Sequence, residues 1–111
     1  MQHKITLNNQ EYVVIFDKKF NRAYKKLTKK DNQKRELIDN TISQFLENPE
    51  DEKLNLHQIH CKVDITRLSM YVRDENKQDT GIRIMLHIIM NEAVLFYVGS
   101  HDAYMRENSD C

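Results

Sequence analysis

A histidine, an aspartate and a tyrosine stand close together near the end of the chain. An apolar run at residues 95–98 is followed by a Gly-Ser pair and then by His101, Asp102 and Tyr104. The run predicts a buried strand, so these side chains are delivered where a strand ends. Histidine exchanges protons near neutral pH, and an adjacent carboxylate can orient its ring. The segment is therefore either one edge of an active site or an ordinary strand end with a turn.

Basic side chains in two further strand-like segments are potential partners for this chemistry. Alternation over residues 65–73 and 82–90 places Arg67 and Arg83 on the face opposite the apolar residues. A guanidinium presents a fork of N–H donors that matches a phosphate. We expect an exposed, polar sheet face that supplies such groups.

A metal site is disfavoured by the sequence. His57, His60 and Cys61 lie in the segment 50–64, which has no clear period, but no second pair of ligands follows at zinc-like spacing. We interpret the segment as a connection with two exposed histidines and expect no metal or cofactor. Cys61 and Cys111 are the two cysteines of the chain, and their wide separation predicts two reduced thiols rather than a disulfide framework.

The elements that must position these groups can be predicted from periodicity. Asp17 and Asp31 are suited to cap two amphipathic helices, and Asn48 with Pro49 ends the second. No helix is predicted after Tyr104. The chain of 111 residues is expected to form one α+β domain over residues 1–111, with a mostly antiparallel four- to five-stranded sheet and an N-terminal helical hairpin packed on one face. The strands are expected at 3–7, 11–16, 65–73, 82–90 and 93–98, and the helices at about 17–28 and 31–48.

Charge is balanced overall but not locally. Seventeen basic and seventeen acidic residues cancel, which argues against an undirected nucleic-acid binder. The segment from Lys18 to Arg35, however, contains nine basic residues and a single acidic residue, Asp31. Such a run is either a solvated helix face or a phosphate-contacting patch. No stretch is as apolar as a membrane span or signal peptide, so we expect a cytoplasmic protein.

Two phrases of the sequence resemble the RelE/ParE superfamily of toxins, most closely its RelE-like mRNA interferase branch. They are Gly-Ile-Arg-Ile at 81–84 and Phe-Tyr-Val-Gly-Ser-His-Asp-Ala-Tyr at 96–104, and the order of elements over nearly the whole chain is also similar. The resemblance implies an RNA endonuclease that cleaves messenger RNA, commonly on the ribosome, and a cognate antitoxin as partner. The ending is also similar to RelE-like domains fused to helicase-type proteins.

Site residues follow from the resemblance position by position. It implies Arg83, His101 and Tyr104 as catalytic residues. Arg67, Lys62, His57 and Asp102 are implied as residues that bind the substrate or orient the catalytic groups. The alternative is a non-catalytic RNA- or protein-binding module, either on its own or as a domain of a larger helicase-type protein. Gyrase inhibition, as in the ParE branch, is disfavoured because the His-Asp-Tyr ending is typical of the ribonuclease branch.

Overall fold

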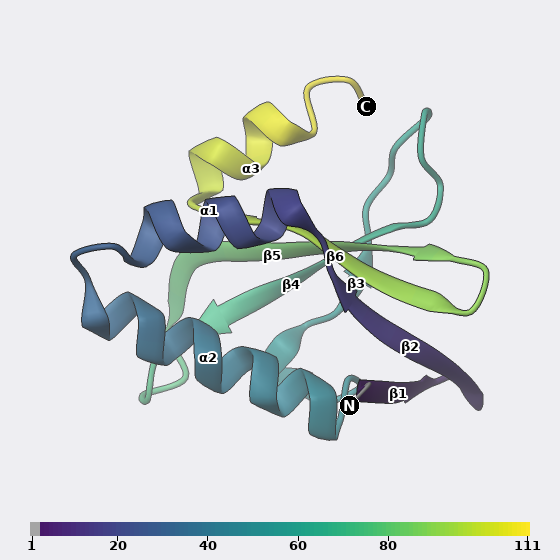
Figure 1. Ribbon diagram of the computed structural model, residues 1–111, viewed down its shortest axis with the longest axis horizontal. Coiled ribbons are helices and arrows are strands. Elements are labelled where there is room, and N and C mark those ends of the chain that lie inside the picture. The colour runs from purple at the N-terminus through teal and green to yellow at the C-terminus, as the bar shows by residue number, and fades with distance from the viewer. Residues whose placement is uncertain (1–2) are drawn as a thin grey trace.

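A mixed β-sheet is the framework of the computed structural model, which describes residues 3–111 (Figure 1). The strands lie in the order β1-β2-β6-β5-β4-β3. The β2–β6 pair is parallel, and the other pairs are antiparallel. The sheet thus has six strands rather than four to five, because a two-residue edge strand forms inside the aperiodic segment. The strands are β1 (His3–Leu7), β2 (Gln10–Phe16), β3 (His57–Gln58), β4 (Arg67–Arg73), β5 (Asp79–Ile89) and β6 (Glu92–Gly99).

The predicted N-terminal hairpin is confirmed, and its turn has a clear cause. Asn8 and Asn9 between β1 and β2 have φ angles of 50° and 65°. Asparagine adopts this left-handed conformation more readily than other residues with a side chain, and a two-residue hairpin turn requires it. The β5–β6 hairpin differs slightly from its prediction, since Met90 has a φ of 55° and is 89% exposed instead of facing the core. The turn therefore begins one residue earlier than expected.

The two helices α1 (Lys18–Thr28) and α2 (Asn32–Glu47) begin where the sequence predicts. Asp17 Oδ1 accepts a hydrogen bond from the backbone N–H of Phe20 at 2.9 Å, and Asp31 Oδ1 accepts one from that of Lys34 at 3.0 Å. Each cap satisfies a donor that has no partner within its helix. A short 3-10 helix, η1 (Glu52–Leu54), follows α2.

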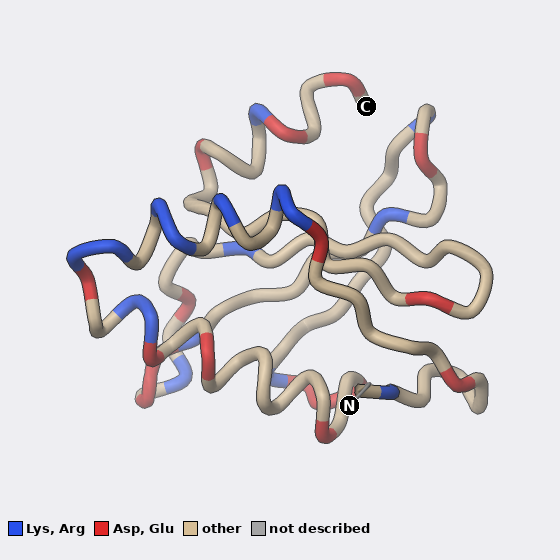
Figure 2. The backbone as a smooth tube through the Cα atoms, viewed as in Figure 1, with Lys and Arg blue, Asp and Glu red and all other residues tan. Residues whose placement is uncertain are grey.

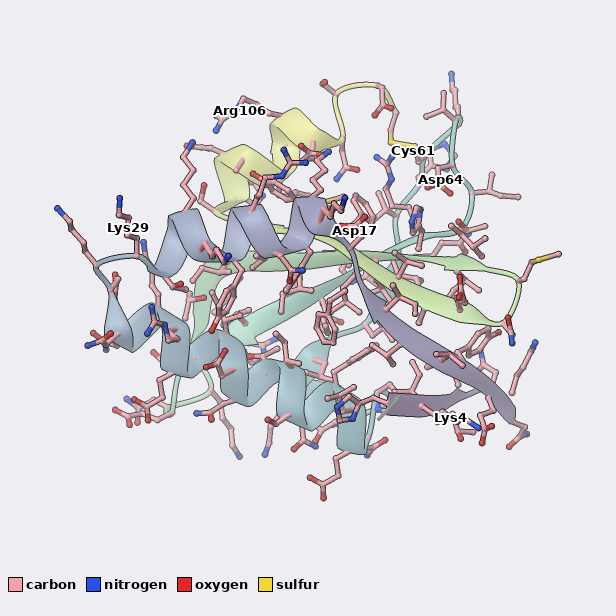
Figure 3. The ribbon with its side chains drawn as sticks, in the orientation of Figure 1. Lys4, Asp17, Lys29, Cys61, Asp64 and Arg106 are labelled. Atoms are coloured by element: carbon pink, nitrogen blue, oxygen red, sulfur yellow. A yellow bond between two sulfur atoms is a disulfide. The ribbon has the colours of Figure 1, made fainter. Side chains whose placement is uncertain are left out.

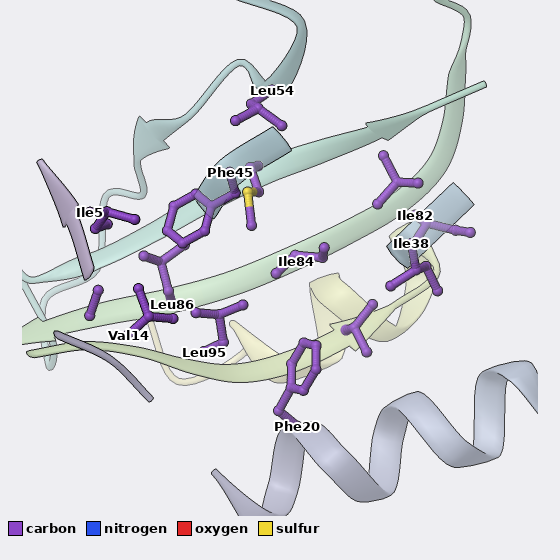
Figure 4. Close-up of a cluster of buried hydrophobic side chains, with 14 residues drawn as sticks. Ile5, Val14, Phe20, Ile38, Phe45, Leu54, Ile82, Ile84, Leu86 and Leu95 are labelled. Carbon is purple, nitrogen blue, oxygen red and sulfur yellow. The ribbon is translucent and has the colours of Figure 1, made fainter. Parts of the chain in front are cut away.

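The hydrophobic core lies between these helices and the sheet (Figure 4). Phe20 of α1 and both Ile38 and Phe45 of α2 are buried against side chains of the strands. Ile84 of β5 and Leu95 of β6 have no exposed surface. The apolar faces predicted for β4 and β5 are therefore core faces, apart from Met90.

The opposite face of the sheet differs from the exposed polar surface that alternation predicts. Ser69 and Met85 have no exposed surface, and Arg83 is 8% exposed. A β-bulge interrupts the β5–β6 pairing between Met85 and Leu86, so Phe96 has no directly opposite partner. Sequence alternation could not predict this bulge or the segment that covers the face.

That covering segment is a third helix, α3 (His101–Glu107), which begins where the sequence predicts a turn and extends past Tyr104, where it predicts no helix. Ser100 caps it, because its hydroxyl accepts a hydrogen bond from the N–H of Ala103 at 3.3 Å. The expected free thiols are also wrong: Cys61 and Cys111 form a disulfide with a Cα–Cα distance of 4.4 Å (Figure 3). No helix in the described part of the chain is long and apolar enough to cross a membrane.

Candidate active site

Arg83 is the centre of a polar cluster on the outer face of the sheet. Its Nη1 and Nη2 donate to Asp79 Oδ1 and Oδ2 at 2.8 and 2.9 Å, and Nη1 also donates to the carbonyl oxygen of Ile82 at 3.2 Å. The Tyr71 ring lies against the guanidinium, with Cζ 3.8 Å from the ring centroid. Arg83 is thus held by a carboxylate at one edge and an aromatic ring on one face.

A bend in β5 makes the contact between Asp79 and Arg83 possible. Four residues of a straight strand span about 13 Å, too far for a hydrogen bond between their side chains. Gly81, with a φ of 84°, stands between the two residues, and its N–H donates to Asp79 Oδ1 at 2.8 Å. Figure 1 shows β5 curving sharply at this end. Asp79 is therefore a site residue that the sequence analysis did not identify, since strand spacing alone separates it from Arg83.

The ion pair changes the electrostatics of the cluster. The hydrogen bond from Arg83 lowers the pKa of the Asp79 carboxyl to about 2. The pKa of Arg83 is raised by the same hydrogen bond, against the opposing effect of burial, and also by the charges of Asp79, Tyr71 and Tyr104. Both groups are charged at neutral pH, so the pair has no net charge.

One edge of the Arg83 guanidinium is left without a protein partner. Asp79 and Ile82 accept from the Nη1/Nη2 side. Among the described residues, Nε makes no hydrogen bond. The Nε–H and the second Nη2–H point in nearly parallel directions, which is the second fork that a guanidinium offers. This fork is therefore the part of the guanidinium that Asp79 does not use, on a side chain that is 10% exposed.

His101 and Tyr104 lie on one face of α3. Residues three apart in a helix are neighbours on its surface. Their ring centroids are 6.0 Å apart with an interplanar angle of 29°, and His101 is exposed. Helix α3 packs against β5, the strand that carries Arg83, and the charge of Tyr104 is one of the causes that raise the pKa of Arg83. The structure thus places His101 and Tyr104 side by side, on a helix that lies against the strand of Arg83.

His57 extends the cluster across the sheet. Its ring meets the Tyr71 ring edge to face at a centroid distance of 5.8 Å. The His57 Nδ1 lies 2.6 Å from the carbonyl oxygen of Asn55, and because a carbonyl only accepts, Nδ1 carries the proton. Nε2 is then the acceptor in the neutral ring. We call the set of His57, Tyr71, Arg83, Tyr104 and His101 the cross-sheet row. Tyr71 belongs to it because strand alternation puts Tyr71 on the same face as Arg83, and this alternation can be read from the sequence.

The other implied residues lie apart from Arg83. Arg67 is held beneath the C-terminal residues: its Nη1 donates to Asn108 Oδ1 at 2.9 Å, and its Nε lies 3.6 Å from Asp64 Oδ2. Lys62 is exposed in the loop between β3 and β4. Asp102 is exposed and lines, with His101, a cavity of about 460 Å³ next to the α1–α2 connection.

An exposed basic surface on α1 borders α3. Figure 2 shows Lys and Arg along the whole helix. Lys19 Nζ forms an ion pair with Glu107 of α3 at 2.6 Å and lies 5.8 Å from the Tyr97 ring centroid. Among the ion pairs of the described residues, none involves the other exposed cations of the helix. These are Lys18, Arg22, Lys25 and Lys26.

One group of sulfur and carboxylate atoms is close enough to resemble a metal site. It consists of Cys61, Asp110 and Cys111. Both sulfurs are bonded to each other, and Arg67 Nη1 lies 3.4 Å from Cys111 Sγ and 3.6 Å from Asp110. A thiolate is the form that binds a metal, and a nearby guanidinium opposes a cation. This group therefore does not fit a metal ion in its present state.

Comparison with solved structures identifies the fold. The structure of YafQ from E. coli strain BL21(DE3) is similar with a TM-score of 0.63 and 10% identity, over 84% of this chain and 97% of that one. The chain has the fold of the RelE-like toxins. A copper-bound mutant toxin from Helicobacter pylori matches with a TM-score of 0.58 and 16% identity, over 81% and 94% of the two chains. The conserved hypothetical protein HP0894 from the same organism matches with a TM-score of 0.54 and 16% identity, over 80% and 93%.

The RelE-like fold confirms the resemblance that the sequence analysis drew from the two phrases at 81–84 and 96–104. No protein-family model matches the sequence, and no curated protein matches it significantly. At identities of 10% and 16%, the solved structures support the fold and not the chemistry. The residues of the cross-sheet row must therefore carry the functional argument.

Proposed function

We propose that this chain is the RelE-like toxin of a type II toxin–antitoxin system, and that it cleaves ribosome-bound messenger RNA without a metal. The observation that carries the proposal is that α3, with His101 and Tyr104 on one face, packs against β5, whose Arg83 makes no hydrogen bond through Nε to any described residue. A phosphate at the Nε edge would lie next to a group that transfers protons and a phenol that donates a hydrogen bond.

The proposed reaction is a transfer of the phosphoryl group within the RNA. His101 accepts the proton of the 2'-hydroxyl, and the 2'-oxygen attacks the adjacent phosphorus. The bond from phosphorus to the 5'-oxygen breaks, and that oxygen takes up a proton, which gives a 2',3'-cyclic phosphate and a 5'-hydroxyl. Arg83 donates to the non-bridging oxygens as negative charge grows on them. Tyr71 and Tyr104 provide aromatic rings on which unstacked bases can rest.

The basic surface of α1 supplies the longer-range attraction that this reaction needs. A row of exposed cations next to α3 would bind RNA phosphates on either side of the scissile one. The same surface would attract an acidic segment of a cognate antitoxin. An antitoxin bound there would exclude RNA from the cross-sheet row.

The test compares cleavage by purified variants with ribosome-bound messenger RNA as substrate. His101→Ala and Arg83→Lys are each expected to lower the cleavage rate by at least 100-fold, the size usual for loss of a proton-transfer or charge-stabilising group. Arg83→Lys retains the charge but removes the fork. His60→Ala, which alters an exposed histidine outside the row, is the matched control and should cleave at the wild-type rate. Unchanged cleavage in both site variants would overturn the catalytic assignment.

A second candidate function is a non-catalytic RNA- or protein-binding module. The observation that favours it is the neutral Asp79–Arg83 pair, which weakens the attraction of Arg83 for a scissile phosphate. Wild-type protein that binds RNA or ribosomes with no cleavage, and loses binding when the lysines of α1 are changed, would support this function over the first.

A further inference from the structure

The C-terminal segment covers the outer sheet face without burying itself. None of the residues of α3 is buried. Polar contacts join it to the rest of the protein: Lys19 pairs with Glu107 at 2.6 Å, and Arg67 Nη1 donates to Asn108 Oδ1 at 2.9 Å and lies 3.6 Å from Asp110 Oδ1. Helices shorter than about 12 residues are marginal unless tertiary packing supports them. Non-covalent contacts alone thus hold this segment weakly.

The polar atoms beneath the segment are poorly satisfied. Among the described residues, the buried side-chain nitrogen and oxygen atoms without a hydrogen-bond partner are Arg67 Nε, Ser69 Oγ and Asn108 Nδ2. Arg67 and Ser69 alternate onto the same face of β4, and Asn108 is bonded to Arg67. Arg67 Nε still lies 3.6 Å from the Asp64 carboxylate, but Ser69 Oγ and Asn108 Nδ2 are buried without a partner, which is unfavourable, and water would satisfy them if the segment moved away. The arrangement in which the C-terminal segment covers the sheet therefore needs a further source of stability.

The Cys61–Cys111 disulfide supplies that stability. It joins the loop before β4 to the last residue of the chain, across a sequence separation of 50 residues. Figure 3 shows it beside the labelled Asp64, where the C-terminal residues meet that loop. Closing a loop of this length strongly restricts the unfolded chain and any state in which the segment is detached. In cytosolic proteins, disulfides of this kind are mostly transient or redox-sensing.

The surroundings of Cys111 favour exchange with an external dithiol. Cys61 is 3% exposed, whereas Cys111 is half-buried, so Cys111 is the sulfur that a thiolate reaches more readily. Attack on Cys111 Sγ breaks the bond to Cys61 and releases its thiolate. The second thiol of the reagent then attacks its own sulfur in the mixed disulfide and expels Cys111. Arg67 Nη1, 3.4 Å from Cys111 Sγ, stabilises that leaving thiolate.

We propose that the Cys61–Cys111 pair is a redox latch that controls the position of α3. In the oxidised form the latch holds α3 on the sheet and keeps His101 and Tyr104 beside Arg83. A dithiol reductant gives up two electrons and two protons, which converts the disulfide into two thiols and the reductant into its own disulfide. The segment 101–111 then detaches, and the cross-sheet row loses His101 and Tyr104. The effect on RNA rests on the proposed function, but the movement of α3 does not.

Hydrogen exchange followed by mass spectrometry tests the latch independently of any activity. The amides of Tyr104 and Asn108 are bonded within the segment, to Ser100 O at 2.8 Å and to Tyr104 O at 3.1 Å. Treatment with dithiothreitol should speed their exchange by roughly tenfold or more, the mark of local opening, while amides of β5 and β6 stay protected. The double variant Cys61→Ser/Cys111→Ser should exchange rapidly with or without dithiothreitol. Unchanged exchange on reduction of the wild-type protein would overturn the latch.

Cleavage measured in parallel separates the latch from the proposed function. If reduction speeds hydrogen exchange and lowers the cleavage rate by at least tenfold, both the latch and the assignment of the oxidised form as the active one are supported. If reduction speeds exchange but neither form cleaves RNA, the latch stands and the ribonuclease function fails. If the reduced form cleaves faster than the oxidised form, control by positioning of α3 is overturned.

Discussion

Replacing Asp79 by asparagine tests the electrostatic account of the Arg83 cluster. The pKa of Asp79 is lowered from 3.8 to about 2, with the hydrogen bond from Arg83 as the largest cause. A shift of that size corresponds to at most roughly 2.4 kcal/mol of stability at neutral pH. The Asp79 side chain is 37% exposed, however, so solvent screens the pair. We expect Asp79→Asn to lower the free energy of unfolding by about 1 kcal/mol at pH 7.

The pH dependence gives the prediction its sign. A carboxyl whose pKa is lower in the folded protein stabilises the fold at every pH above its unfolded value of 3.8. That stabilisation is lost progressively as the pH falls below about 5, and near pH 2, the folded-state pKa, about half of the carboxyl is protonated in the folded protein. Urea denaturation of wild type and Asp79→Asn should thus show a constant difference in stability down to about pH 5, which falls to a small fraction of its value near pH 2. Subtracting the pH profile of the unfolding free energy of Asp79→Asn from that of the wild type cancels the contributions of the other carboxyl groups.

Two further variants complete the experiment. Glu75→Gln removes an exposed charge from the loop before β5 and should change stability by less than about 0.5 kcal/mol. In a double-mutant cycle with Arg83→Met, the coupling energy with Asp79→Asn should be about 1 kcal/mol. Equal stability of wild type and Asp79→Asn at pH 7, or a difference at pH 2 as large as the one at pH 7, would refute the reasoning.

Three further predictions concern stability and use the urea midpoint as the measurement. Asp17→Ala removes the cap of α1 and should cost about 1 kcal/mol, whereas Asp17→Asn should cost far less. Gly99→Ala would place a Cβ 2.8 Å from Tyr97 Cε2 and 3.1 Å from the Cβ of Ala103, so it should cost roughly 1–3 kcal/mol, and less when Tyr97 is also changed to Leu. Phe45→Ala leaves a cavity at a side chain with no exposed surface and should cost about 3–5 kcal/mol; an effect below 1 kcal/mol would contradict the assigned core.

Some residues of the site could be predicted from the sequence, and others could not. The alternation of β5 placed Arg83 off the core face, and the end of β6 placed His101 and Tyr104 near a strand end. Nothing in the spacing indicated Asp79, because its contact depends on the bend at Gly81. Sequence alternation also predicted that Arg67 would be available to a substrate, whereas the structure holds it beneath the C-terminal residues.

The sequence by itself determined what depends on neighbouring residues. The Asn8–Asn9 turn, the caps at Asp17 and Asp31, and the apolar face of β5 each follow from backbone preferences or from spacing within one element. These local signals were enough to predict an α+β fold, and the resemblance to RelE-like toxins came from the phrases at 81–84 and 96–104 together with the order of elements.

Only the tertiary structure decided what depends on residues far apart in the chain. Cys61 and Cys111 are 50 residues apart, and sequence spacing says nothing about whether two such sulfurs meet. The same contact between the loop before β4 and the chain end holds α3 over the sheet. A polar face that the sequence pattern predicts to be exposed thereby becomes a largely covered one, on which Arg83 is 8% exposed and pairs with Asp79.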